Sequence, residues 1–156
     1  MADPGVVLSI LFYDWDGAGT RATVSADRGG EPLMDSMHPE QEYFAHLAAG
    51  RFMLQRSVST GGYVFYPRVA EPGTGATDLE WVEASGRGVV YAATTVRQRP
   101  PTADYGVALI ELDEGPRLIS RVDGLPPAEV EIGMRVRARI VHESEGPLLV
   151  FVPVEP

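Results

Sequence analysis

The chain has 156 residues, a formal net charge of −9 at pH 7 and no cysteine, and all 13 of its basic residues are arginine. A chain of this length can bury a hydrophobic core without a metal or disulfide staple, so we expect one domain or one domain with a small appendage. The missing cysteines exclude disulfides, thiol nucleophiles and cysteine-bound metals. The acidic balance argues against a nucleic-acid partner, because nucleic-acid binders gather Lys and Arg against the phosphates.

Residues 1–36 are the first of three predicted zones, an N-terminal extension for which the sequence suggests no role. The apolar run Val6–Tyr13 has the length of a strand, and a glycine-rich polar stretch follows it. No basic residue precedes Arg21 and the run is too short to cross a bilayer, so we expect neither a signal peptide nor a transmembrane helix. The expected location is the cytoplasm, without a membrane partner.

The second zone, residues 37–80, begins with "MHPEQEYFAHLAAG", which predicts a short amphipathic helix. Pro39 suits the first helical position and Gly50 suits the stop. The residues that share its apolar face are Tyr43, Phe44, Leu47 and Ala48. This face either packs into the core or docks on a partner, and both interpretations remain open.

The rest of the second zone has the pattern of a small metal-binding ribbon. Arg51–Arg56 alternates as a strand, and Gly61 and Gly62 permit a tight turn. Tyr63–Tyr66 predicts a second strand that Pro67 ends, and "AEPGTGAT" predicts a loop.

The third zone, residues 81–156, is nearly all strand and turn. The stretch "GRGVVYAATTVRQRP" predicts one strand, and "YGVALIELDEGPRLISRVDG" and "IGMRVRARIVHESEGPLLVFVPV" each predict a hairpin. Between the hairpins, "LPPAEVEI" suits a loop or one short helical turn. About five strands with one irregular connection predict a closed barrel of the OB type, with a small β-sandwich as the alternative. The predicted fold class is therefore mainly β.

No catalytic set is recognisable in the sequence. The three histidines, His38, His46 and His142, show none of the spacings of metal ligands. The stretch "GTGAT" at residues 73–77 lacks the lysine of a phosphate-binding loop. Most carboxylates fall in turns, where they are ordinarily solvated, and no acid–base pair is forced together. We therefore expect a protein that is not itself an enzyme.

Two groups of arginines are candidates for binding an anion. In "MRVRARI" the arginines alternate with apolar residues, so they share one strand face that is either plain solvent surface or a patch for phosphate or carboxylate groups. These are Arg135, Arg137 and Arg139. A second group, predicted to bind ligand, is Arg87, Arg97 and Arg99.

From about residue 31 to residue 153 the chain resembles the zinc-ribbon/OB-fold acyl-CoA-associated proteins. The stretches that carry the resemblance, in order, are "AAGRFMLQRS", "FYPR", "DLEWVEASGRGVVYAATTVR", "YGVALIELDEGPRLISRVDG", "IGMRVRARI" and "VFVP". Their combination and order are specific, although none of them would be so alone. The resemblance implies an amphipathic helix, ribbon-like hairpins and a C-terminal five-stranded OB-fold barrel.

The family's zinc site is degenerate in this chain. The four ligand positions that the resemblance implies fall on Ser57, Thr60, Glu71 and Thr74, and none of them is a cysteine. Hydroxyls are poor zinc ligands and one carboxylate does not hold the ion, so we predict that zinc and other cofactors are absent. A scaffold survives such a loss if its surfaces persist, so the departure favours a structural role.

The resemblance implies a non-catalytic accessory or scaffold subunit of a thiolase-superfamily enzyme that acts on acyl-CoA or acyl thioesters. The expected partner is a thiolase, an aldolase, a ketosynthase-like acyltransferase or a hot-dog-fold hydratase, with a CoA thioester near the interface. The predicted docking residues are Phe44, Leu47, Phe52, Leu54, Tyr63 and Phe65. The alternative is a stand-alone OB module that binds CoA, with the second arginine group near its phosphates. An oligonucleotide-binding OB domain is disfavoured by the acidic charge.

Overall fold

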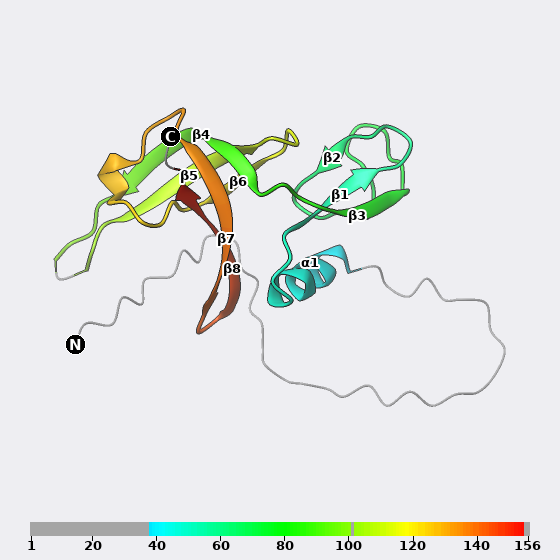
Figure 1. Ribbon diagram of the computed structural model, residues 1–156. Helices are drawn as coiled ribbons and strands as arrows, with labels where there is room; N and C mark the ends of the chain where they lie inside the picture. Colours follow the sequence, from blue (N-terminus) through cyan, green and yellow to red (C-terminus); the bar gives the residue numbers. More distant parts are fainter. Residues whose placement is uncertain (1–37, 101, 155–156) are drawn as a thin grey trace, which may run out of the picture. The chain divides into compact units, whose positions relative to one another are not determined.

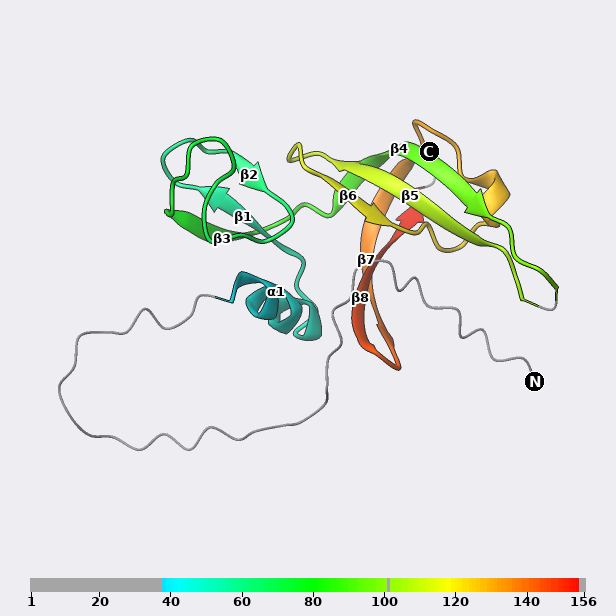
Figure 2. The same ribbon diagram turned by 180° about the vertical axis from the view of Figure 1, so that it is seen from behind.

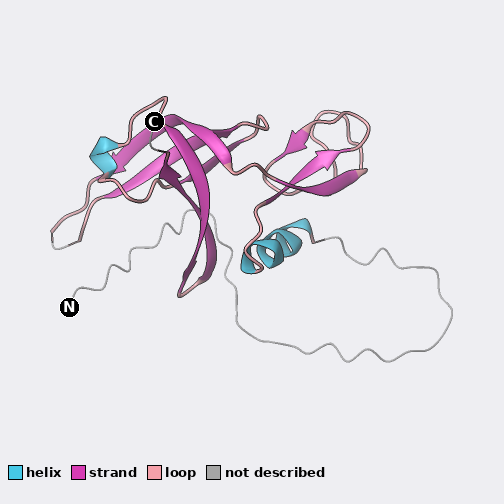
Figure 3. Cartoon of the chain, viewed as in Figure 1, coloured by secondary structure: helices cyan, strands magenta, loops and turns pink. Residues whose placement is uncertain are grey.

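The computed structural model describes residues 38–100 and 102–154, so the predicted N-terminal extension and its apolar run lie outside the described residues. The described part contains one α-helix, one 3-10 helix and eight strands, which form two sheets (Figures 1 and 3). No helix in this part of the chain has the length and apolar character that crossing a bilayer requires.

The predicted amphipathic helix is present as α1, Pro39–Ala48. It starts at the proline because that residue's ring presets the helical backbone and its missing N–H has no partner to lose at a first turn. Glu40 and Glu42 lie in the first turn, where the helix dipole favours negative charge. Tyr43 and Leu47 are buried, so much of the apolar face packs into the core.

The second zone folds as a three-stranded antiparallel sheet in the order β2–β1–β3. Its strands are β1 (Met53–Ser57), β2 (Tyr63–Val64) and β3 (Leu79–Glu83). Strand β2 is shorter than the predicted Tyr63–Tyr66, because Phe65 and Tyr66 leave the ladder and pack their rings near α1. All of β3 pairs with β1, so the predicted zone boundary between residues 80 and 81 falls inside a strand.

The third zone folds as an antiparallel five-stranded sheet in the order β6–β5–β4–β7–β8. Its elements are β4 (Arg87–Val96), β5 (Tyr105–Leu112), β6 (Arg117–Ser120), the 3-10 helix η1 (Pro127–Glu129), β7 (Arg135–Glu143) and β8 (Gly146–Pro153). The two predicted hairpins are β5–β6 and β7–β8, and the short helical turn between them is η1. The sheet curls, as Figures 1 and 2 show from opposite sides.

A parallel bridge between Val122 and Phe151 joins the two edges of the curled sheet. The N–H of Asp123 donates to the Phe151 carbonyl at 2.7 Å, and the N–H of Phe151 donates to the Arg121 carbonyl at 3.0 Å. The chain after β6 therefore meets β8 and closes most of a barrel. This connection is that of an OB-fold and not of the alternative sandwich, because one sheet curls onto itself.

The core follows the alternation of the strands. In β5 from Ala108 to Leu112 every second residue is buried, while its neighbours are only half-buried. The residues that the barrel strands contribute to one continuous buried cluster are Val90, Ala108, Ile110, Leu112, Leu118, Val136, Leu149 and Phe151. The same continuous cluster includes Tyr43 and Leu47 of α1 and Leu54 of β1, so helix, small sheet and barrel share one core.

Candidate functional site

Two turns of the small sheet carry the four positions that correspond to zinc ligands in the resemblance. The first turn comprises residues 57–62 and the second comprises residues 71–76, and the corresponding positions are the first and fourth residue of each. The fifth residues, Gly61 and Gly75, both adopt φ of 74°, which favours glycine. In each turn the N–H of this glycine donates to the carbonyl of the first residue, at 2.8 and 2.9 Å. The two turns therefore have the same backbone design.

The side chains of the two turns meet at one carboxylate. Thr60 Oγ1 donates to Glu71 Oε1 at 2.6 Å, and Thr74 Oγ1 donates to Glu71 Oε2 at 2.5 Å. Each threonine oxygen also accepts a backbone N–H two residues further along, from Gly62 at 3.1 Å and from Ala76 at 3.2 Å. We call Ser57, Thr60, Glu71 and Thr74 the hydroxyl–carboxylate clasp.

A second carboxylate supports the first turn. The hydroxyl of Ser57, which is fully buried, donates to Asp78 Oδ1 at 3.1 Å, and the N–H of Ser59 donates to Asp78 Oδ2 at 2.8 Å. Hydrogen bonds from Thr60 and then Thr74 lower the pKa of Glu71. Hydrogen bonds from Ser59 lower the pKa of Asp78 in the same way. Both carboxylates are therefore held in their ionised form.

The clasp does not fit the zinc ion that the resemblance implies. Its donor atoms are three hydroxyl oxygens and one carboxylate, whereas structural zinc is held by thiolate and imidazole. Both oxygens of Glu71 are already bonded to threonine hydroxyls. Within residues 38–100 and 102–154, no three His, Cys, Asp or Glu side chains gather as a metal site.

The predicted docking residues separate into two groups. Leu47, Phe52 and Leu54 are buried in the core, so in this fold they are not available to a partner and their assignment to a docking surface is corrected. The physical reason is that one core joins the helix, the small sheet and the barrel, and it takes these side chains. The three half-buried members, which pack against the core with part of the ring exposed, are Phe44, Tyr63 and Phe65.

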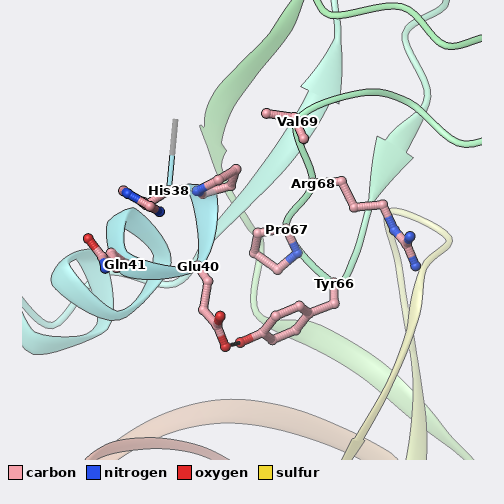
Figure 4. A pocket seen from close by; sticks show the side chains of 8 residues that line it. His38, Glu40, Gln41, Tyr66, Pro67, Arg68 and Val69 are labelled. Carbon is pink, nitrogen blue, oxygen red and sulfur yellow. Dashed lines mark hydrogen bonds between the residues drawn. The ribbon is translucent and has the colours of Figure 1, made fainter. Parts of the chain in front are cut away.

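Aromatic rings connect α1 to the segment after β2. Tyr43 makes edge-to-face contacts with Phe44, Phe65 and Tyr66 at centroid distances of 5.6, 5.8 and 6.1 Å. The Tyr66 hydroxyl donates to Glu40 Oε1 at 2.6 Å across a shallow pocket lined by the start of α1 and residues 66–69 (Figure 4). Burial and then this hydrogen bond raise the pKa of Tyr66 above its usual range.

The arginines are arranged differently from the predicted groups. Arg87 begins β4, whereas Arg97 and Arg99 follow its other end, about 30 Å away along the strand. Arg97 instead pairs with Asp104 at 3.6 Å. The three residues predicted as one ligand-binding group therefore do not form a patch.

Arg87 faces the "MRVRARI" strand instead, where it lies directly opposite Arg137 in the β4–β7 ladder. Asp113 lies 3.5 Å from Arg87 and 3.9 Å from Arg135. Among the described residues Arg137 has no ion-pair partner. We call Arg87, Arg135 and Arg137 the arginine face, because the three side chains lie on one face of neighbouring strands, where one carboxylate pairs with two of them.

Comparison with known proteins identifies the family to which this fold belongs. Residues 81–141 match the family described as ChsH2, C-terminal OB-fold domain. A chain of the solved structure "Ltp2-ChsH2(DUF35) aldolase" is 32% identical, with a TM-score of 0.65, over 74% of this chain and 94% of that chain. The chain belongs to the DUF35 family.

Curated relatives of this DUF35 chain have two kinds of description. A "DUF35 domain-containing scaffold protein" of Methanocaldococcus jannaschii is 33% identical over 90 residues, which cover 51% of this chain and 64% of the relative. A "Probable enoyl-CoA hydratase alpha subunit" of Thermomonospora curvata is 36% identical over 118 residues, which cover 73% of this chain and 37% of the relative. The chain thus spans little more than a third of the hydratase subunit.

Sequence reasoning located the four clasp positions of this DUF35 chain but missed their supporting residues. Asp78 directly precedes β3, and its pairing with Ser59 has no local signal, because 19 positions separate the two residues. Tyr66 was predicted to lie in a strand, and the proline after it favours extended backbone, so no local pattern indicates that its ring packs against Tyr43 of α1.

Proposed function

We propose that the chain is a non-catalytic accessory or scaffold subunit of a thiolase-superfamily enzyme complex that acts on acyl-CoA or another acyl thioester. The observation that carries this proposal is the match to 94% of a DUF35 chain in a structure named for Ltp2, ChsH2 and an aldolase. The scaffold description of the M. jannaschii relative supports it. The proposed partner is a thiolase, an aldolase or a ketosynthase-like acyltransferase. A hot-dog-fold hydratase is the second choice, supported by the hydratase name of the T. curvata relative.

The proposed docking surface is the aromatic rim formed by Phe44, Tyr63 and Phe65. Half-buried aromatic rings anchored in a core supply contact area without a large loss of side-chain entropy, and such residues dominate interface energies. Tyr66 and Val69 expose further apolar surface in the segment after β2. Burial of this remaining exposed apolar surface against a second protein would favour association.

The first test isolates the tagged chain from its native cell extract and identifies by mass spectrometry the protein that accompanies it at stoichiometric yield. The expected partner is an enzyme of one of the proposed classes. Its turnover of an acyl-CoA, measured after reconstitution from purified proteins, should require this chain. A chain that purifies alone, or a partner whose turnover does not change when the chain is removed, contradicts the proposal.

The docking surface is tested in the reconstituted complex. The double variant Phe44→Ala with Tyr63→Ala should weaken association by about 30-fold or more. Ile132→Ala, whose side chain is 72% exposed, is the matched control and should bind normally. Unchanged co-elution of a folded double variant would contradict the assignment. If the double variant does not fold, Phe44→Leu and Phe65→Leu keep most of the apolar volume while removing the aromatic contacts.

A second candidate function is direct binding of CoA by the barrel, and the arginine face favours it. Its three guanidiniums share one strand face, and among the described residues only one carboxylate, that of Asp113, pairs with any of them, so the face has a local excess of positive charge in a strongly acidic chain. Guanidiniums bind phosphate in bidentate geometry. Calorimetry of the isolated protein with CoA, with Arg137→Glu as the comparison, tests this function. No heat at millimolar CoA, or equal binding by Arg137→Glu, would argue against it.

A further inference from the structure

The two turns of the small sheet repeat one hydrogen-bonding design and face each other. In both turns the fourth residue is a threonine whose oxygen accepts a backbone N–H from its own turn. Both threonines donate their hydroxyl proton to the same side chain, that of Glu71. Thr60 is 11 positions from Glu71, so this carboxylate ties the first turn to the second.

Close packing independently places the carboxylate between the turns. A Cβ atom added at Gly62 would lie 2.8 Å from Glu71 Oε1 and 3.2 Å from Thr60 Oγ1. The Glu71 oxygen therefore lies directly against the backbone of the first turn, in space that only a glycine leaves open. This contact does not depend on the assignment of hydrogen-bond donors.

We propose that the Glu71 carboxylate joins the two turns by hydrogen bonds, at the place where the resemblance implies a metal ion. The small sheet then folds without metal, and charge-assisted hydrogen bonds from two threonines replace metal–ligand bonds. Ser57, at the remaining position, is satisfied by Asp78 instead and stays buried. This inference concerns only how the sheet is held together, so it stands independently of the proposed function.

The first experiment replaces the carboxylate by an amide in Glu71→Gln. Glutamine keeps the shape but offers one acceptor oxygen and an NH2 donor, so one threonine hydroxyl loses its acceptor. Amide hydrogen exchange at Gly61 and Gly75, whose N–H groups close the two turns, should accelerate about tenfold or more. The matched control Glu83→Gln removes a charge from the exposed surface of β3 and should leave these amides unchanged.

Two outcomes of that experiment would overturn the proposal. One is unchanged protection of both glycine amides in Glu71→Gln. The other is a metal requirement of the natural chain, seen as faster exchange after treatment with a strong chelator or as one equivalent of zinc in the purified protein.

The second experiment tests whether the four positions still converge on one point. The variant with cysteine at all four clasp positions, kept reduced, should bind one equivalent of Co²⁺ with the visible spectrum of tetrahedral thiolate ligation. The control with Ser57→Cys and Thr60→Cys alone should bind more weakly and lack that spectrum. Folding of the fourfold variant only when metal is added agrees with the proposal. Failure of the fourfold variant to bind Co²⁺, whether or not it is folded before the metal is added, contradicts the proposal.

Discussion

The side chain of Gln55 pairs with both backbone polar groups of Arg68, as a neighbouring strand would. Its Nε2–H donates to the Arg68 carbonyl at 2.9 Å, and its Oε1 accepts the Arg68 N–H at 2.7 Å. Gln55 is buried in β1, so this amide anchors the segment that follows β2 and carries the "FYPR" stretch.

Gln55→Ala should therefore destabilise the protein by about 1–3 kcal/mol, because it leaves backbone groups of Arg68 without partners in a partly buried place. Gln55→Glu should also destabilise, since a carboxylate cannot donate to the Arg68 carbonyl. Urea denaturation of the full chain measures both effects. Gln41→Ala, on the exposed side of α1, is the control and should stay within about 0.5 kcal/mol of the natural chain.

Phe151 combines a core position with the closing bridge of the barrel. Its side chain is fully buried, and its backbone groups bond to Arg121 and Asp123. Phe151→Ala should reduce the free energy of unfolding by about 3–5 kcal/mol, because it empties a large volume where the sheet edges meet. Thermal and urea unfolding measure this loss. Ile119→Ala, at a 61% exposed position on β6, should change stability by less than about 0.5 kcal/mol, and equal effects would place the core elsewhere.

Arg87 and Arg137 are like charges directly opposite each other in the β4–β7 ladder. Arg137→Glu should turn this repulsion into an ion pair and raise stability by about 0.2–1 kcal/mol at low salt. High salt should diminish the gain, because both groups are exposed.

Arg97→Glu is the control, for which we expect a change in stability of the opposite sign. It should lower stability slightly, since Arg97 pairs with Asp104 in the natural chain. If Arg137→Glu gains stability and also loses affinity for CoA, the arginine face binds the ligand at a cost in stability. A loss of stability in Arg137→Glu would contradict this interpretation.

The clasp should weaken in acid. The folded-state pKa of Glu71 is lowered, chiefly by hydrogen bonds from Thr60 and Thr74, while desolvation and then the like charge of Asp78 oppose this shift. Its contribution is therefore complete above the unfolded-state pKa of about 4.3 and is lost as pH falls through the lower folded-state value. Stability measured by urea denaturation between neutral pH and about pH 3 should fall less steeply in Glu71→Gln than in the natural chain. Identical slopes would show that Glu71 does not contribute.

Local patterns predicted most of the elements. Pro39 and the helical spacing behind it predicted α1, and the period-two alternation of "YGVALIEL" predicted β5 with one buried face. The resemblance predicted the OB fold, and the match over residues 81–141 and the curled five-stranded sheet with its Val122–Phe151 bridge confirm it. Strand β2 was predicted too long, since a residue pattern does not show when rings leave a ladder to pack on a helix.

The sequence by itself therefore determined the order and type of the elements, because side-chain periodicity and turn residues act within a few positions. Only the tertiary structure decided which distant residues meet. It brought Glu71 to Thr60, set Arg87 opposite Arg137 instead of beside Arg97, and put Leu54 in the core. These contacts depend on strand register and on which faces share the core, and both are set by the packing of the whole chain.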